Sequence, residues 1–127
     1  MNDGHAVRMI ELVINATPPG LNELRRWART ERYKEFARWN RWVFLALTEF
    51  SPRTPEPLAR AKVNIERRSP GQLEPENLQG SCQVVLDVLR EQGVIEDARP
   101  DRIELVATQS RGKPRTTIRI TPLPLPS

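Results

Sequence analysis

The pattern of hydrophobic residues along the chain predicts four β-strands. The first is expected at 7–14, a mostly apolar stretch, and the second at 58–68, where apolar and polar residues alternate. Two more are expected at 103–108 and 115–121. The residues between them, 110–114, contain a glycine and a proline, and they are predicted to join the last two strands like a hairpin loop.

Apolar residues at helical spacing predict two helices between the strands. The first is expected to run from Asn22, as its N-cap, to about residue 50, with a break near 29–30 as an alternative. The second is expected at 76–92, where an apolar stripe includes Cys82 as a buried thiol. Gly93 is expected to end this helix.

The order of these elements is strand, helix, strand, helix, strand, strand. It predicts an α/β (α+β) fold in which two helices pack on a small mixed sheet of about four strands. The 127 residues are expected to form a single domain, with a flexible leader at 1–6 and a proline-rich tail at 122–127.

Composition removes several classes of function. One cysteine, Cys82, and one histidine, His5, exclude a disulfide framework, a cysteine-based zinc cage and a histidine-dependent catalytic triad. No apolar run reaches the roughly 18–20 residues of a membrane helix, and the start does not resemble a secretory signal. The chain is therefore expected to be cytoplasmic, without a membrane partner. If it is an enzyme, its chemistry is expected to depend on carboxylates.

Positive charge is concentrated in the first predicted helix. The net charge is only +4, with a pI near 10.0, but several arginines alternate with aromatic residues between positions 25 and 42. Arginine and aromatic side chains together suit nucleic acids, while a solvated helix face would have the same pattern. The candidates for DNA contact here are Arg25, Arg26, Trp27, Arg29 and Arg32; Trp39 and Trp42 are expected in the core or in a dimer interface.

Two further groups of cations are candidates for DNA contact. Arg67 and Arg68 end the second predicted strand just before an acidic motif, where they could hold a phosphate. Arg111 and Lys113 lie in the loop between the last two strands, and either a phosphate contact or simple solvation fits them.

Two acidic pairs flank the second predicted helix. Glu74 and Glu76 precede it on either side of a proline, and Glu96 and Asp97 follow it. Four such carboxylates would suit Mg²⁺, which prefers oxygen ligands. A helix of about seventeen residues is roughly 25 Å long, so one chain cannot join its two ends at a metal. Either the helix ends early, or the pairing crosses a dimer axis, or the carboxylates are only helix-end and loop charges.

These motifs resemble the RusA-type Holliday-junction resolvases. That family has an Asp-x-Asp-Asn motif before a helix and an Asp-Asp pair after it, which here stand as Glu74-Pro75-Glu76-Asn77 and Glu96-Asp97. An early proline-asparagine segment of the family is matched by Pro18-Pro19-Gly20-Leu21-Asn22. The resemblance extends over roughly residues 7–120.

The resemblance implies a homodimeric endodeoxyribonuclease of phage or prophage type. Such an enzyme binds four-way or branched DNA and cuts it with Mg²⁺, or with Mn²⁺ in its place, in recombination and repair. Carried over by position, Glu74, Glu76 and Asp97 would be catalytic metal ligands and Glu96 a further ligand. Asn77 would orient the metal ligands without binding the metal itself.

The chain departs from the family pattern at two points. Both motif aspartates are glutamates here, whose extra methylene moves the carboxylate oxygens. The family's lysine on the following helix is also missing, since its candidate positions are Gly80 and Gln83. Two alternatives therefore stand beside the nuclease: a RusA-like protein that binds branched DNA without cutting it, and a non-enzymatic assembly protein.

Overall fold

The computed structural model describes residues 9–50 and 56–125. The predicted leader with His5, the start of the first predicted strand and the last two residues of the tail lie outside this part of the chain. Among the described residues, none of the helices combines the length and the apolar character needed to cross a membrane.

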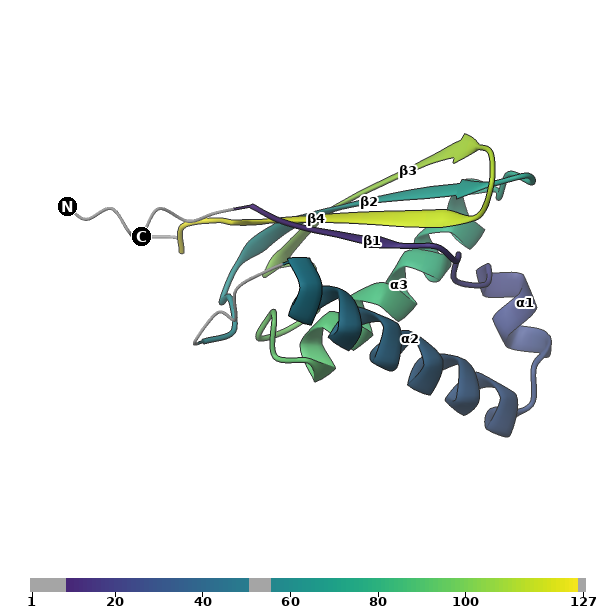
Figure 1. Cartoon of the computed structure of the whole chain (residues 1–127), viewed down its shortest axis with the longest axis horizontal. Coiled ribbons are helices and arrows are strands. Elements are labelled where there is room, and N and C mark those ends of the chain that lie inside the picture. The colour runs from purple at the N-terminus through teal and green to yellow at the C-terminus, as the bar shows by residue number, and fades with distance from the viewer. Residues whose placement is uncertain (1–8, 51–55, 126–127) are drawn as a thin grey trace.

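The described chain forms a mixed α+β fold, as predicted. Its order is β1 (Ile10–Ile14), α1 (Leu21–Arg26), α2 (Arg29–Phe50), β2 (Ala61–Ser69), α3 (Pro75–Glu91), β3 (Ile103–Arg111) and β4 (Arg115–Pro122). The sheet order is β1-β4-β2-β3, with β3 parallel to β2 and β4 antiparallel to both β1 and β2. Figure 1 shows the helices on one face of this sheet, while the opposite face is open.

The first predicted helix is in fact two helices. It starts at Leu21 with Gly20 as the N-cap, so the prediction of Asn22 as N-cap is wrong. The break comes at Trp27, whose backbone is extended (φ −81°, ψ 145°), slightly before the alternative break at 29–30. An extended residue ends the run of helical hydrogen bonds, and α2 then leaves in a new direction. The fold therefore has three helices rather than two.

The last two strands do not form the predicted hairpin. They lie on opposite sides of β2, because the α3 connection places β3 parallel to β2 on one side and leaves the other side for β4. The loop between them crosses the end of β2. There the Gly112 N–H donates to the Ser69 carbonyl (3.2 Å), and Arg68 Nε donates to the Lys113 carbonyl (3.0 Å).

The core lies between the sheet and the helices. Residues of β1, β2 and β4 alternate between buried and more exposed positions, as expected for a sheet covered on one face. Trp39 is 0% exposed, and its indole Nε1 donates to Glu35 (3.1 Å), while Trp42 packs edge-on against it. The prediction of Cys82 as a buried thiol is confirmed, and burial raises its pKa to about 11.

Candidate functional site

Glu74 and Glu76, here called the carboxylate pair, lie at the N-terminus of α3. Glu74 is the N-cap in an extended conformation, Pro75 is the first helical residue, and Glu76 lies in the first turn. Proline suits this position because its fixed φ is helical and its missing N–H would have had no helical partner. Both glutamates are exposed, and neither belongs to an ion pair within the described residues. Their carboxylates remain available to a ligand.

Asn77 connects the carboxylate pair to α1. Its side-chain oxygen Oδ1 accepts a hydrogen bond from the Asn22 backbone N–H (3.0 Å), one of the first amides of α1. Asn22 and Asn77 line one open hollow with the carboxylate pair. Since the first amides of a helix have no partner inside it, Asn77 caps α1 from a different helix. This contact places two amide side chains beside the two carboxylates.

The segment before α1 is held by its Pro18 carbonyl. That oxygen accepts hydrogen bonds from Arg67 Nε (3.3 Å), Arg67 Nη2 (3.2 Å) and Ser81 Oγ (2.9 Å). Arg67 is only 8% exposed, and burial lowers its pKa, with the nearby Cys82 and Glu23 opposing this effect. The predicted phosphate contact for Arg67 therefore does not fit, because its guanidinium points into the protein and anchors the loop.

Sequence analysis missed Gln109, which holds the residue before the carboxylate pair. Its side chain makes two reciprocal hydrogen bonds with Leu73: the Leu73 N–H donates to Oε1 (2.9 Å), and Nε2 donates to the Leu73 carbonyl (2.7 Å). Gln109 lies opposite Arg67 in the β2–β3 register. The available signal was that Gln109 is polar, although it occupies one of the alternate positions of β3 that begin with the buried Ile103.

Exposed arginines lie on α1 and at the start of α2. Helix α1 packs against α3, and together they border a second hollow that includes Glu76. The sequence candidates on α1 and at the start of α2 are exposed and form no ion pair within the part of the chain that the structure describes, whereas Trp27 between them is half-buried. These cations are Arg25, Arg26, Arg29 and Arg32.

The loop across β2 brings a second group of cations to the same end of the molecule. Figure 1 shows the ends of β2 and β3 on the same side of the view as α1 and the start of α3. Arg68 donates to the Lys113 carbonyl, and Arg111 Nη1 donates to the Pro70 carbonyl (3.2 Å). Lys113 is exposed. The carboxyl ends of parallel strands are where open α/β sheets bind ligands, and here they have positive charge.

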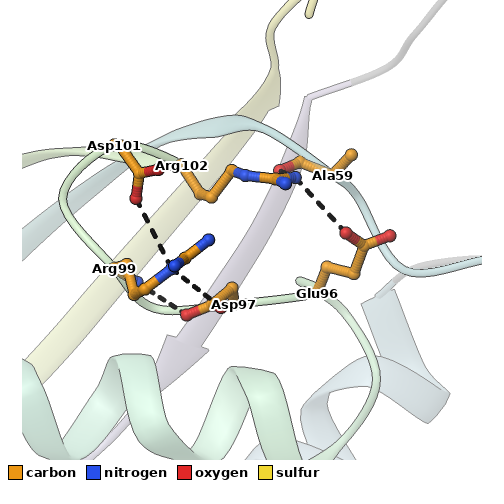
Figure 2. A network of polar contacts seen from close by, with 6 residues as sticks. All are labelled: Ala59, Glu96, Asp97, Arg99, Asp101 and Arg102. Carbon is orange, nitrogen blue, oxygen red and sulfur yellow. Dashed lines mark hydrogen bonds and ion pairs between the residues drawn. The ribbon is translucent and has the colours of Figure 1, made fainter.

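The second acidic pair lies at the opposite end of α3. Helix α3 has 17 residues, so about 25 Å separates its ends. Figure 2 shows that both carboxylates there already have partners: Glu96 pairs with Arg102 (3.3 Å), and Asp97 pairs with Arg99 (3.0 Å). Asp97 Oδ1 also accepts the Arg99 backbone N–H (3.0 Å).

The predicted metal ligands are therefore not brought together in one chain. Over residues 9–50 and 56–125, no three His, Cys, Asp or Glu residues are placed to share a metal ion. The carboxylate pair alone still fits Mg²⁺, which proteins commonly hold with one or two carboxylates, water and a substrate phosphate. In one chain, the candidate donors for a divalent cation are then Glu74 and Glu76 alone.

Gly80 lies where α1 packs closely against α3. A Cβ at Gly80 would lie 2.5 Å from the Cβ of Leu21, closer than real side chains approach each other. Leu21 of α1 thus occupies the space into which a longer residue at position 80 would extend.

Comparison with known proteins adds no assignment. No protein-family model matches the chain, and a search of curated proteins finds no match.

Proposed function

We propose that this chain is a Mg²⁺-dependent, structure-selective endodeoxyribonuclease of the RusA type, which acts on four-way or branched DNA in the cytoplasm. The observation that carries the proposal is the exposed carboxylate pair, which shares a hollow with Asn22 of α1, in a chain whose α1–α2 arginines and loop across β2 supply exposed cations. Carboxylates bind the metal and arginines bind phosphate, so the two together suit a phosphodiester substrate.

Each residue of the carboxylate pair and its surroundings would have a separate role in the proposed reaction. Glu74 and Glu76 would hold Mg²⁺ against the scissile phosphate, and Asn77 would keep α1 with its arginines beside them. Bound Mg²⁺ would activate a water and stabilise the leaving oxygen. In the reaction, the water oxygen bonds to phosphorus and one P–O ester bond breaks, which leaves a phosphate monoester and a hydroxyl.

A labelled four-way junction, with linear duplex beside it, tests this proposal with and without Mg²⁺ or Mn²⁺. Metal-dependent paired nicks on the junction alone would support a nuclease. Binding without cutting would favour the second candidate, a RusA-like protein that only holds branched DNA, for which Gly80 in place of a cation is the specific observation. If neither binding nor cutting occurs at low salt, both DNA-binding proposals fail and the non-enzymatic assembly protein becomes the favoured function.

Removal of the α1 arginines is expected to weaken DNA binding in a salt-dependent way. Each lost phosphate contact lowers the slope of log K against log salt by about 0.7–0.9. The variant Arg25→Ala/Arg26→Ala should therefore bind less tightly at low salt and show a slope smaller by up to about 1.8. Lys62→Ala, an exposed cation on the open sheet face, is the matched control and should leave the slope unchanged. An equal slope in the double variant would place the DNA elsewhere.

A homodimer would complete the site, and one face of α3 suits a second copy. Glu76, Gln83 and Arg90 share this face by helical spacing, and it borders the apolar hollow between α1 and α3. If two α3 helices pack antiparallel about Gln83, Glu76 of each copy lies beside Arg90 of the other. The same arrangement brings the Glu96–Asp97 end of one copy toward the carboxylate pair of the other.

Charge reversal on this face is expected to separate the copies. Arg90→Glu should weaken self-association at least about tenfold in sedimentation equilibrium, since like charges would then meet Glu76. The combination Arg90→Glu/Glu76→Arg should restore it, and Lys62→Glu on the open sheet face should not change it. If Arg90→Glu associates like the unmodified chain, the second copy does not bind to this face of α3.

A further inference from the structure

Three groups of side-chain contacts hold the approach to the carboxylate pair. Arg67 and Ser81 hold the Pro18 carbonyl, Asn77 holds α1, and Gln109 holds Leu73. Of these, only the Gln109 contact is made to the residue adjacent to Glu74. We propose that Gln109 is a positioning residue: it sets the backbone from which Glu74 projects, and so sets the metal affinity of the carboxylate pair. This inference rests on the proposed metal site.

The geometry of the contact supports this role. The Gln109 amide uses both of its ends on the backbone N–H and carbonyl of Leu73, at 2.9 and 2.7 Å. It thus pairs with Leu73 as a neighbouring strand would, although Leu73 lies outside the sheet. A single hydrogen bond would let the peptide rotate about it, whereas two bonds from one planar group fix its direction.

The Leu73 side chain is held as well. Its Cδ2 and Cδ1 atoms would lie 3.2 and 3.3 Å from a Cβ at Gly20, so it packs directly on the backbone before α1. Glu74 follows with φ −64° and ψ 154°, and its carbonyl accepts the Leu78 N–H (2.9 Å), the first hydrogen bond of α3. Glu74 is therefore held between a clamped residue and the helix. Its own carboxylate has no cap hydrogen bond to orient it.

The chain contains a matched control for this contact. Gln92, at the other end of α3, donates from Nε2 to the Asn40 carbonyl (3.2 Å) and so ties α3 to α2. Gln92→Met removes the hydrogen bonds of Gln92 to the carbonyl and side-chain oxygens of Asn40, on the side of α3 that faces α2. Gln109→Met removes the contact to Leu73 while keeping a side chain of similar length. Comparison of the two variants separates a loss of stability from a loss of position.

The experiment titrates Mn²⁺ into the full chain without DNA and follows the paramagnetic broadening of the amide signals of Glu74 and Glu76. Loss of a residue that orients a metal ligand commonly weakens the metal about 10–100-fold, and here we expect about tenfold for Gln109→Met. Gln92→Met should keep the Mn²⁺ affinity of the unmodified chain, even if its Tm falls as far as that of Gln109→Met. Hydrogen exchange at the Leu73 N–H should become faster only in Gln109→Met.

Each outcome decides the proposal. Unchanged Mn²⁺ affinity in Gln109→Met would overturn it, as would an equal loss in both variants, which would make the contact merely structural. Absence of Mn²⁺ broadening at Glu74 and Glu76 in the unmodified chain would overturn the metal site and the positioning role together. If the expected affinities are found but junctions are not cut, the proposed nuclease fails while Gln109 keeps its role.

Discussion

Glu76→Gln is expected to lower the rate of Mg²⁺-dependent junction cleavage at least about 100-fold, because an amide is a poor ligand for a hard divalent cation. The substitution keeps the shape of the side chain and leaves the α1–α2 arginines in place. The affinity for the junction should therefore change less than about threefold, since phosphate contacts supply most of the binding energy. Single-turnover cleavage and gel-shift binding measure the two quantities separately.

Glu104→Gln is the matched control for this substitution. Glu104 is an exposed carboxylate of β3, in register with Lys62 on the open sheet face, and its loss should leave cleavage unchanged. Cleavage by Glu76→Gln at the rate of the unmodified chain would show that the site assignment is wrong. A loss of both cleavage and binding would instead show that Glu76 serves the fold or the dimer.

Mixed dimers show whether two chains share one site. Glu76→Gln and Asp97→Asn are each expected to be inactive alone if Asp97 reaches the carboxylate pair of the second copy. A dimer with one copy of each variant then contains one complete site, so mixing should restore nicking of one strand. If each chain used only its own carboxylates, the mixture would remain inactive, and if Asp97 serves only its contacts to Arg99, Asp97→Asn alone would cut.

Gly80→Lys is expected to destabilise the protein by about 1–3 kcal/mol rather than to add a cation that promotes cleavage. The new Cβ would meet Leu21 at 2.5 Å, so α1 must move away from α3. This movement would also strain the contact between Asn77 and the Asn22 amide. Urea unfolding measures the change in the free energy of unfolding, and cleavage of the junction should not increase.

Two further variants test whether the contact between position 80 and Leu21 causes the loss of stability. In Leu21→Gly/Gly80→Lys the cost of the lysine should be smaller than in the unmodified chain, because the Leu21 Cβ that meets the new Cβ is gone. Ala37→Lys, at an exposed position of α2, should change stability by less than about 0.5 kcal/mol. A Gly80→Lys protein as stable as the unmodified chain would show that α1 packs on α3 less tightly than described.

The sequence predicted the elements better than their neighbours in the sheet. Alternating residues located the strands, and the apolar stripe located α3, because both patterns are local. The pairing of β4 with β2 instead of β3 depends on which side of β2 the α3 connection leaves open. Residues 110–114 suit a hairpin and a crossing of β2 equally well, so local sequence does not distinguish these arrangements.

The candidate site likewise combines features that local sequence patterns predict with features that depend on distant residues. Pro75 between two glutamates placed the carboxylate pair at a helix start, and the structure has it there. Arg67 and Arg68 were both assigned to a phosphate because they end a strand just before the acidic motif, but neighbouring strand residues point to opposite faces. The alternation that buries Val63 and Ile65 also buries Arg67. The two hydrogen bonds of Gln109 join residues 36 positions apart, a separation beyond the reach of local sequence patterns.

The position of β4 determines when this fold can form. The strand that comes last along the chain lies inside the sheet, between β1 and β2, and Thr116 donates to the Ala16 carbonyl across 100 positions of sequence. During synthesis, β1 therefore cannot pair with β4 until the residues about 100 positions further along the chain have been made. Such long-range pairing slows folding. Until β4 arrives, the apolar face of β1 is exposed on the nascent chain.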